Sequence, residues 1–72
     1  MTVIYQDETE KLGTYCLIKD LYAIIEVLGK YQALHITRYV GDHCPEKPDT
    51  RFLWCNTEDE AKKEINRMKR FE

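Results

Sequence analysis

The alternation of apolar and polar residues is clearest over residues 21–40, where two runs of branched and aromatic residues flank Gly29-Lys30. Valine and isoleucine lose rotamer freedom in a helix and pack well on a pleated surface, so both runs favour β-strands. A glycine at the first central position suits a two-residue type II′ turn. The pattern therefore predicts an antiparallel hairpin in which Leu28 faces Tyr31.

The predicted register sorts the side chains of this hairpin onto two faces, because successive residues of a strand point to opposite sides. One face carries Ala23, Ile25, Val27, Leu34 and Ile36. The other carries Tyr22, Ile24, Leu28, Tyr31, Ala33, His35, Thr37 and Tyr39, with Glu26 among them. This second face is apolar and aromatic.

The first half of the hairpin also fits a helix, which is the competing interpretation for residues 15–28. Thr14 could cap that helix and Gly29 could end it, with an apolar face of Leu17, Ile18, Leu21, Ile25 and Leu28. We prefer the strand because β-branched residues are frequent here. The segment YAIIEVLGKYQ is also similar to the opening strand–turn–strand of a family of large-subunit ribosomal proteins, and this resemblance implies the same hairpin geometry.

A helix is predicted from residue 57 to the end of the chain. Thr57 and Glu60 have the spacing of a capping box, and acidic residues crowd the first turn. Apolar residues then recur at helical spacing and form a narrow stripe, which consists of Ala61, Ile65, Met68 and Phe71.

Three shorter runs complete the predicted elements: TVIYQ before a polar DETEK turn, GTYCLIK after it, and RFLWC before the helix. Over residues 1–72 we expect a single α+β domain, a small antiparallel β-meander of three to five strands with one C-terminal α-helix packed on one face. We expect the helix on the face of Ala23 and Ile25. Either the pair Leu53 and Cys55 or the pair Phe52 and Trp54 joins that core.

Composition and charge indicate a small globular protein. The chain has 72 residues, a formal net charge of -2 and no apolar run near the ~20 residues of a membrane span. No signal-peptide pattern follows Met1, so we expect a cytoplasmic location. Three irregularly spaced cysteines suit reduced thiols better than a disulfide framework.

The stretch Asp42–Asn56 holds the candidate chemistry. His43, Cys44 and Cys55 could bind zinc with Cys16 or His35, but no recognised ligand spacing exists, so we predict neither a metal nor a cofactor. Cys44 beside His43 is a weak candidate for a nucleophile. The chain contains no serine, and we expect no enzymatic activity.

The strongest functional prediction concerns the face that the helix is expected to leave bare. Its partner-binding residues would be Tyr22, Ile24, Tyr31, His35 and Tyr39, an aromatic patch of the kind that monomers seldom expose. The face could pair with itself in a homodimer, dock a protein partner or stack unpaired bases. Alternatively, the N-terminal segment folds across it.

Protein binding is the preferred interpretation, because Glu26 lies among the aromatic residues while Arg38 points to the other side. A small accessory or inhibitor protein has this character, as do small antagonists encoded by phages or mobile elements. The alternative is a nucleic-acid-binding domain that combines the tyrosine-rich sheet with a basic helix. The basic residues of that helix are Lys62, Lys63, Arg67, Lys69 and Arg70.

Overall fold

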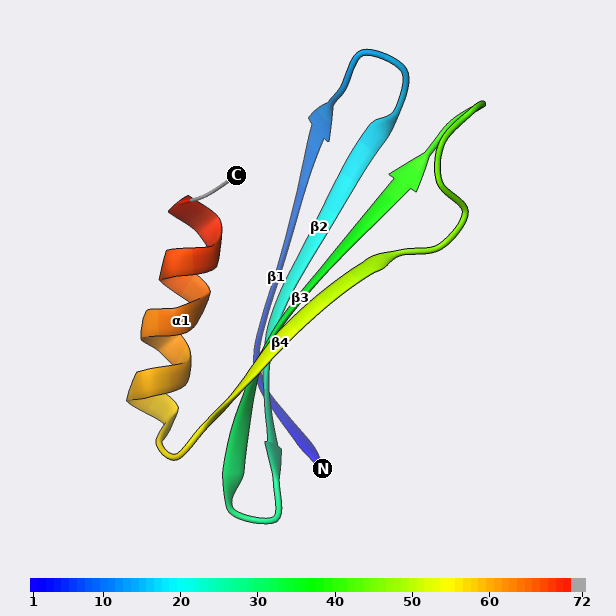
Figure 1. The fold of residues 1–72 in the computed structure, drawn as a ribbon. Helices are drawn as coiled ribbons and strands as arrows, with labels where there is room; N and C mark the ends of the chain where they lie inside the picture. Colours follow the sequence, from blue (N-terminus) through cyan, green and yellow to red (C-terminus); the bar gives the residue numbers. More distant parts are fainter. Residues whose placement is uncertain (71–72) are drawn as a thin grey trace.

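A computed structural model of the chain describes residues 1–70 and contains one antiparallel sheet and one helix (Figure 1). The elements are β1 (Thr2–Leu12), β2 (Leu17–Val27), β3 (Lys30–Val40), β4 (Asp49–Cys55) and α1 (Glu58–Arg70). The strands lie side by side in the order β1-β2-β3-β4. The predicted α+β meander with a C-terminal helix is therefore confirmed, and residues 17–27 form a strand instead of the competing helix.

The first turn lies later than the sequence predicts. The DETEK segment continues β1, where its residues pair with β2 from Tyr22 to Ile18, and the turn follows at residues 13–16. The expectation of a turn at DETEK is wrong because the charged side chains lie on an edge strand open to water. The N-terminal segment is thus a strand of the sheet and does not fold across either face.

The hairpin turn is centred on Leu28 and Gly29, one residue before the predicted pair. Both have positive φ angles, 51° and 77°, as a type I′ turn requires. Val27 therefore pairs with Lys30, and Tyr22 pairs with His35. The register differs from the predicted one by two residues, which keeps every paired strand residue on its predicted face.

The helix begins at the predicted cap. The Glu60 amide donates to Thr57 Oγ1 at 3.2 Å, and the Asn56 amide donates to the Glu60 carboxylate at 3.1 Å. Ala61 and Ile65 of the predicted stripe are buried. Met68 is partly buried against them, and Phe71 lies outside the described residues.

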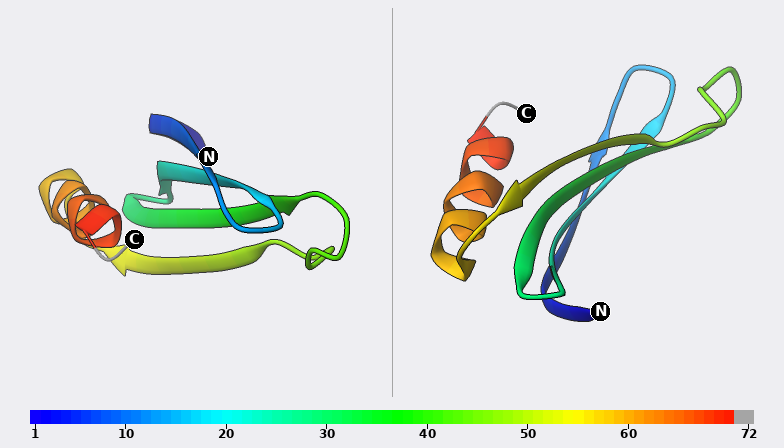
Figure 2. Two further views of the ribbon diagram at one scale, coloured as in Figure 1. Left: turned by 90° about the horizontal axis from the view of Figure 1, so that it is seen from above. Right: turned by 60° about the horizontal axis from the view of Figure 1, so that its bottom comes forward.

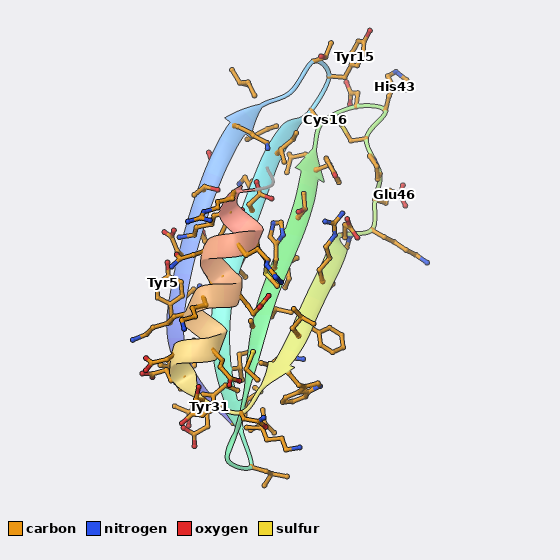
Figure 3. The ribbon with its side chains drawn as sticks, turned by 60° about the vertical axis from the view of Figure 1, so that its left-hand side comes forward. Tyr5, Tyr15, Cys16, Tyr31, His43 and Glu46 are labelled. Atoms are coloured by element: carbon orange, nitrogen blue, oxygen red, sulfur yellow. A yellow bond between two sulfur atoms is a disulfide. The ribbon has the colours of Figure 1, made fainter. Side chains whose placement is uncertain are left out.

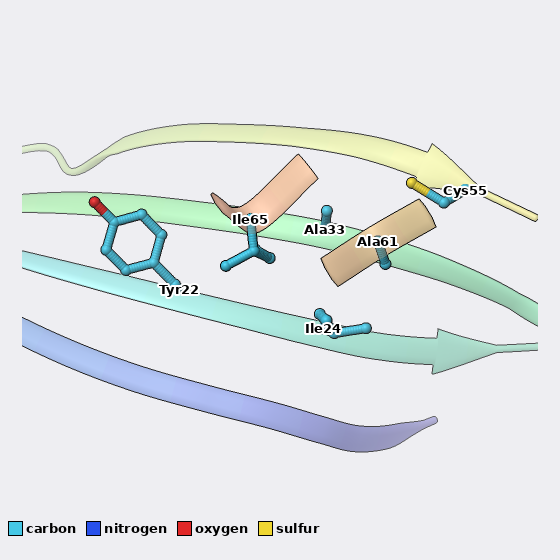
Figure 4. Packing of buried hydrophobic residues seen from close by; sticks show 6 residues of the cluster. All are labelled: Tyr22, Ile24, Ala33, Cys55, Ala61 and Ile65. Atoms are coloured by element: carbon cyan, nitrogen blue, oxygen red, sulfur yellow. The ribbon is translucent and has the colours of Figure 1, made fainter. Parts of the chain in front are cut away.

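The helix packs on the opposite face of the sheet from the one predicted. The buried cluster beneath it consists of Tyr22, Ile24, Ala33, Cys55, Ala61 and Ile65 (Figure 4). Alanine on both sides, Ala33 in β3 and Ala61 in α1, lets the helix approach the sheet closely. The expectation that α1 covers Ala23 and Ile25 is therefore wrong, and Figure 2 shows the other side of the sheet without any element of the described chain.

A disulfide joins Cys16 to Cys44, with a Cα–Cα distance of 6.2 Å. It ties the β1–β2 loop to the β3–β4 loop at the end of the sheet farthest from the hairpin turn (Figure 3). Gly41 allows this close approach, since a Cβ atom there would lie 3.1 Å from the Tyr15 carbonyl oxygen. The prediction of three reduced thiols is wrong for these two cysteines. The fold brings together residues that are 28 positions apart in the chain.

Candidate protein-binding surface

The residues predicted to bind a partner lie on the helix side of the sheet. Tyr22, Ile24 and His35 are buried, and Ile24 has no exposed surface at all. Tyr31 packs against the core cluster, and Tyr39 is half-buried on the same side of the sheet. The predicted exposed aromatic patch is therefore absent from this face, because α1 covers most of it.

The opposite face is the one that α1 leaves bare, and we call it the open face. Strand pairing arranges this face in three rows: Glu8, Leu21, Ile36 and Thr50; Gln6, Ala23, Leu34 and Phe52; and Val3, Ile25, Gln32 and Trp54. Eight of these twelve residues are apolar. Val27 extends the surface towards the hairpin turn. Of the two pairs proposed for β4, Cys55 turns towards the helix, whereas Phe52 and Trp54 turn towards the open face.

Several of these side chains are extensively exposed. Phe52 and Trp54 have 52% and 53% of their surface exposed, and Val3 has 53%. A sheet with one solvated face normally alternates apolar and polar residues, so that the outer face is polar. Here apolar residues predominate on both faces. The open face includes Gln6, Gln32 and Thr50, but its apolar side chains form a patch of the kind that marks an interaction site.

Charged residues border the open face at its disulfide end. Glu8 and Glu10 lie on β1, and Lys19 and Arg38 lie on the two central strands. The Lys19 ammonium is 3.6 Å from the Glu10 carboxylate. These residues line a shallow hollow of about 290 Å³ above Leu21 and Ile36. The rim thus contains both signs of charge.

A buried polar cluster on the helix side is the second candidate site. His35 Nε2 lies 2.9 Å from Asp20 Oδ1, and the Thr37 hydroxyl donates to the same oxygen at 2.9 Å. Thr37 Oγ1 is also 3.2 Å from His35 Nε2. A nucleophile relay needs the hydroxyl and the carboxylate at opposite ring nitrogens. Here both contact Nε2, so the cluster lacks that arrangement and serves to tie β2 to β3.

Lys69 links the end of the helix to β1. Its ammonium donates to Asp7 Oδ2 at 2.8 Å and to the Tyr5 hydroxyl at 2.9 Å. It also lies 5.2 Å from the ring centroid of Tyr22, which in turn stacks on His35. The hydrogen bond to Asp7, followed by the one to Tyr5, raises the pKa of Lys69 above its ordinary value.

The cysteine chemistry considered for residues 42–56 is altered by the disulfide. Cys44 is bonded to Cys16, so it has no thiol to act as a nucleophile. Cys55 is free but buried, and burial raises the pKa of its thiol, with the carboxylates of Glu64 and Glu60 adding to the rise. Among residues 1–70, no three or more His, Cys, Asp or Glu side chains form a group that could hold a metal ion.

The basic helix is largely engaged by acidic neighbours. Lys62 lies 3.5 Å from Glu58, Arg67 lies 3.4 Å from Glu64, and Lys69 is bound to β1. The other two predicted phosphate-binding residues are Lys63 and Arg70, both exposed. Since α1 and the open face lie on opposite sides of the sheet, these cations do not combine with the exposed aromatic residues.

The helix of the described chain is too short and too polar to cross a membrane. Disulfides persist in oxidising compartments and are uncommon in the cytosol, so the cytoplasmic location stays a prediction. Comparison with protein families, with curated proteins and with solved structures finds no match to this chain.

Proposed function

We propose that this protein acts by protein–protein contact through the open face. The observation that carries the proposal is an apolar sheet face, bordered by charge, that no part of the described chain covers. Domains normally bury each apolar face against a second layer. Such a face fits a partner that presents a flat apolar surface of its own. The sequence-based proposal of a protein-binding module is therefore kept, but it moves to the other side of the sheet.

The core supports the same conclusion. The buried cluster beneath α1 consists of six residues of the described chain, two of them alanine: Tyr22, Ile24, Ala33, Cys55, Ala61 and Ile65. Larger side chains, among them Leu34 and Ile36, lie on the open face instead. Burying a large aliphatic or aromatic side chain stabilises a protein by about 1.5–3 kcal/mol. Much of the apolar surface that the chain could bury therefore lies on the open face. Burying it against a partner would stabilise the folded protein.

The test uses a photo-reactive benzophenone side chain in place of Phe52, introduced in the cells that make the protein. Phe52 lies on the open face beside Leu34, on the edge strand β4, and the benzophenone preserves its aromatic character. The matched control carries the same group at Asp59, which is exposed at the start of α1. We expect a protein adduct from position 52 and none from position 59. Equal labelling at both positions, or none at position 52, would contradict the proposal.

A further inference from the structure

We infer that the occupant of the open face is a second copy of this chain, which packs open face against open face. This inference rests on the proposed function and names its partner. The resulting dimer is a four-layer unit with the two sheets in the middle and an α1 helix outside each sheet. Its two-fold axis runs between the sheets, so both copies use the same residues.

The size of the face is of the order that a stable dimer needs. From Lys19 to Val27 it runs about 27 Å along the strands and about 19 Å across the four of them, roughly 500 Å² in projection. Side chains roughen the surface, so its accessible area is larger than the projection. It approaches the about 800 Å² that each partner buries in an interface of standard size.

The shape of the face also suits a copy of itself. Strands have a right-handed twist, and two sheets with the same twist pack face to face with their strands about 30° apart. Ala23 leaves the middle of the face low between Leu21 and Ile25, which stand higher on the same strand. Interdigitation of large side chains with such a depression is how the inner faces of a sandwich fill their shared core.

The charged rim allows self-association. Contacts across a two-fold interface are reciprocal, and with the axis along the strands the charged end of one copy meets the same end of the other, where a rim of one sign would repel itself. Here Glu8 and Glu10 accompany Lys19 and Arg38, which places opposite charges within reach of each other. The same acidic residues oppose a nucleic-acid strand, because phosphates would lie beside the carboxylates of β1.

The availability of the partner favours a second copy over another protein. A domain of about 70 residues rarely obtains more than about 3–5 kcal/mol from a single core. Six buried residues of the described chain, two of them alanine, form that core here. Another copy is present wherever the chain is made, so dimerisation can complete the core during folding without waiting for a separate partner.

The experiment measures the mass of the purified, disulfide-bonded protein by sedimentation at about 1–200 µM chain. We expect twice the 8.6 kDa of one chain at the upper end. Phe52→Asp should give a monomer with an unchanged far-ultraviolet spectrum, while the control Asp59→Asn should remain dimeric. A single-chain mass for the wild type at the highest concentration would overturn the inference.

The single tryptophan, Trp54, gives a second readout of the same interface. Quenching of its fluorescence by acrylamide should be weak in the dimer and strong in the Phe52→Asp monomer. A dimer in which Trp54 is quenched as strongly as a free indole would place the interface elsewhere and overturn the inference.

If the wild type is monomeric but position 52 cross-links to a different protein, the self-pairing fails and the proposed function stands. An adduct to nucleic acid, or no adduct, would overturn both.

Discussion

Removing the Cys16–Cys44 disulfide should lower the stability of this domain by a large fraction of its total. The bond closes a loop of 28 residues that contains the whole β2–β3 hairpin. In the chain-entropy model, a closed loop of this length restricts the unfolded chain by about 3.6 kcal/mol at 25 °C. Because the core of a domain of this size rarely supplies more than about 3–5 kcal/mol, the disulfide provides roughly half of the stability, and the double variant Cys16→Ala/Cys44→Ala should retain at most about 3–5 kcal/mol.

Urea unfolding followed by circular dichroism measures this loss. With a slope near 1 kcal/mol per molar urea, the midpoint should fall by about 3.6 M. Wild type and variant are compared at one chain concentration, because self-association adds to stability. Reductant should move the wild-type midpoint to that of the variant and leave the variant unchanged. A reduced wild type with the midpoint of the oxidised protein would refute the loop-closure argument.

Three further predictions concern the cap, the hairpin turn and the helix–strand link. Thr57→Ala removes the hydroxyl that accepts a hydrogen bond from the Glu60 amide and should lower the free energy of unfolding by about 1 kcal/mol, whereas the conservative control Thr57→Ser should change it little. Leu28→Asn should raise the melting temperature, because Leu28 is 99% exposed at positive φ and Asn-Gly is a preferred type I′ pair; a lower melting temperature would mean that Leu28 contributes contacts. Lys69→Met removes the ion pair with Asp7 and should cost up to about 1 kcal/mol at neutral pH. Because the folded state raises the pKa of Lys69, the wild-type advantage is complete below the ordinary lysine pKa of about 10.4 and is lost as pH rises through the raised value. Equal wild-type advantages at pH 7 and pH 11 would contradict this account.

The hairpin shows how much of the fold can be predicted from the sequence alone. The predicted turn was misplaced by one residue, which changed the pairing from Leu28–Tyr31 to Val27–Lys30. An even shift keeps each strand side chain on its face, so the two sets of residues were predicted correctly apart from Leu28, which lies in the turn. The turn itself was misjudged because Leu28 adopts a positive φ, which propensity disfavours for a leucine.

The side on which the helix packs could not be read from alternation, because both faces of the hairpin are apolar. The choice depends on tertiary detail: the small side chains of Ala33 and Ala61, and the reach of Lys69 to Asp7 on a strand more than 60 residues away. The disulfide escaped prediction for a similar reason. Only the antiparallel arrangement of the two loops brings Cys16 and Cys44 within bonding distance.

The acidic residues of β1 limit how this protein can associate. β1 is a long edge strand whose unpaired backbone could otherwise recruit strands from other molecules, but Asp7, Glu8 and Glu10 would place like charges side by side in such a ribbon. The opposite edge, β4, is only seven residues long and leads directly into the helix. Lateral growth into fibrils is therefore disfavoured at both borders of the sheet, and any assembly that forms through the open face closes on itself at a fixed size.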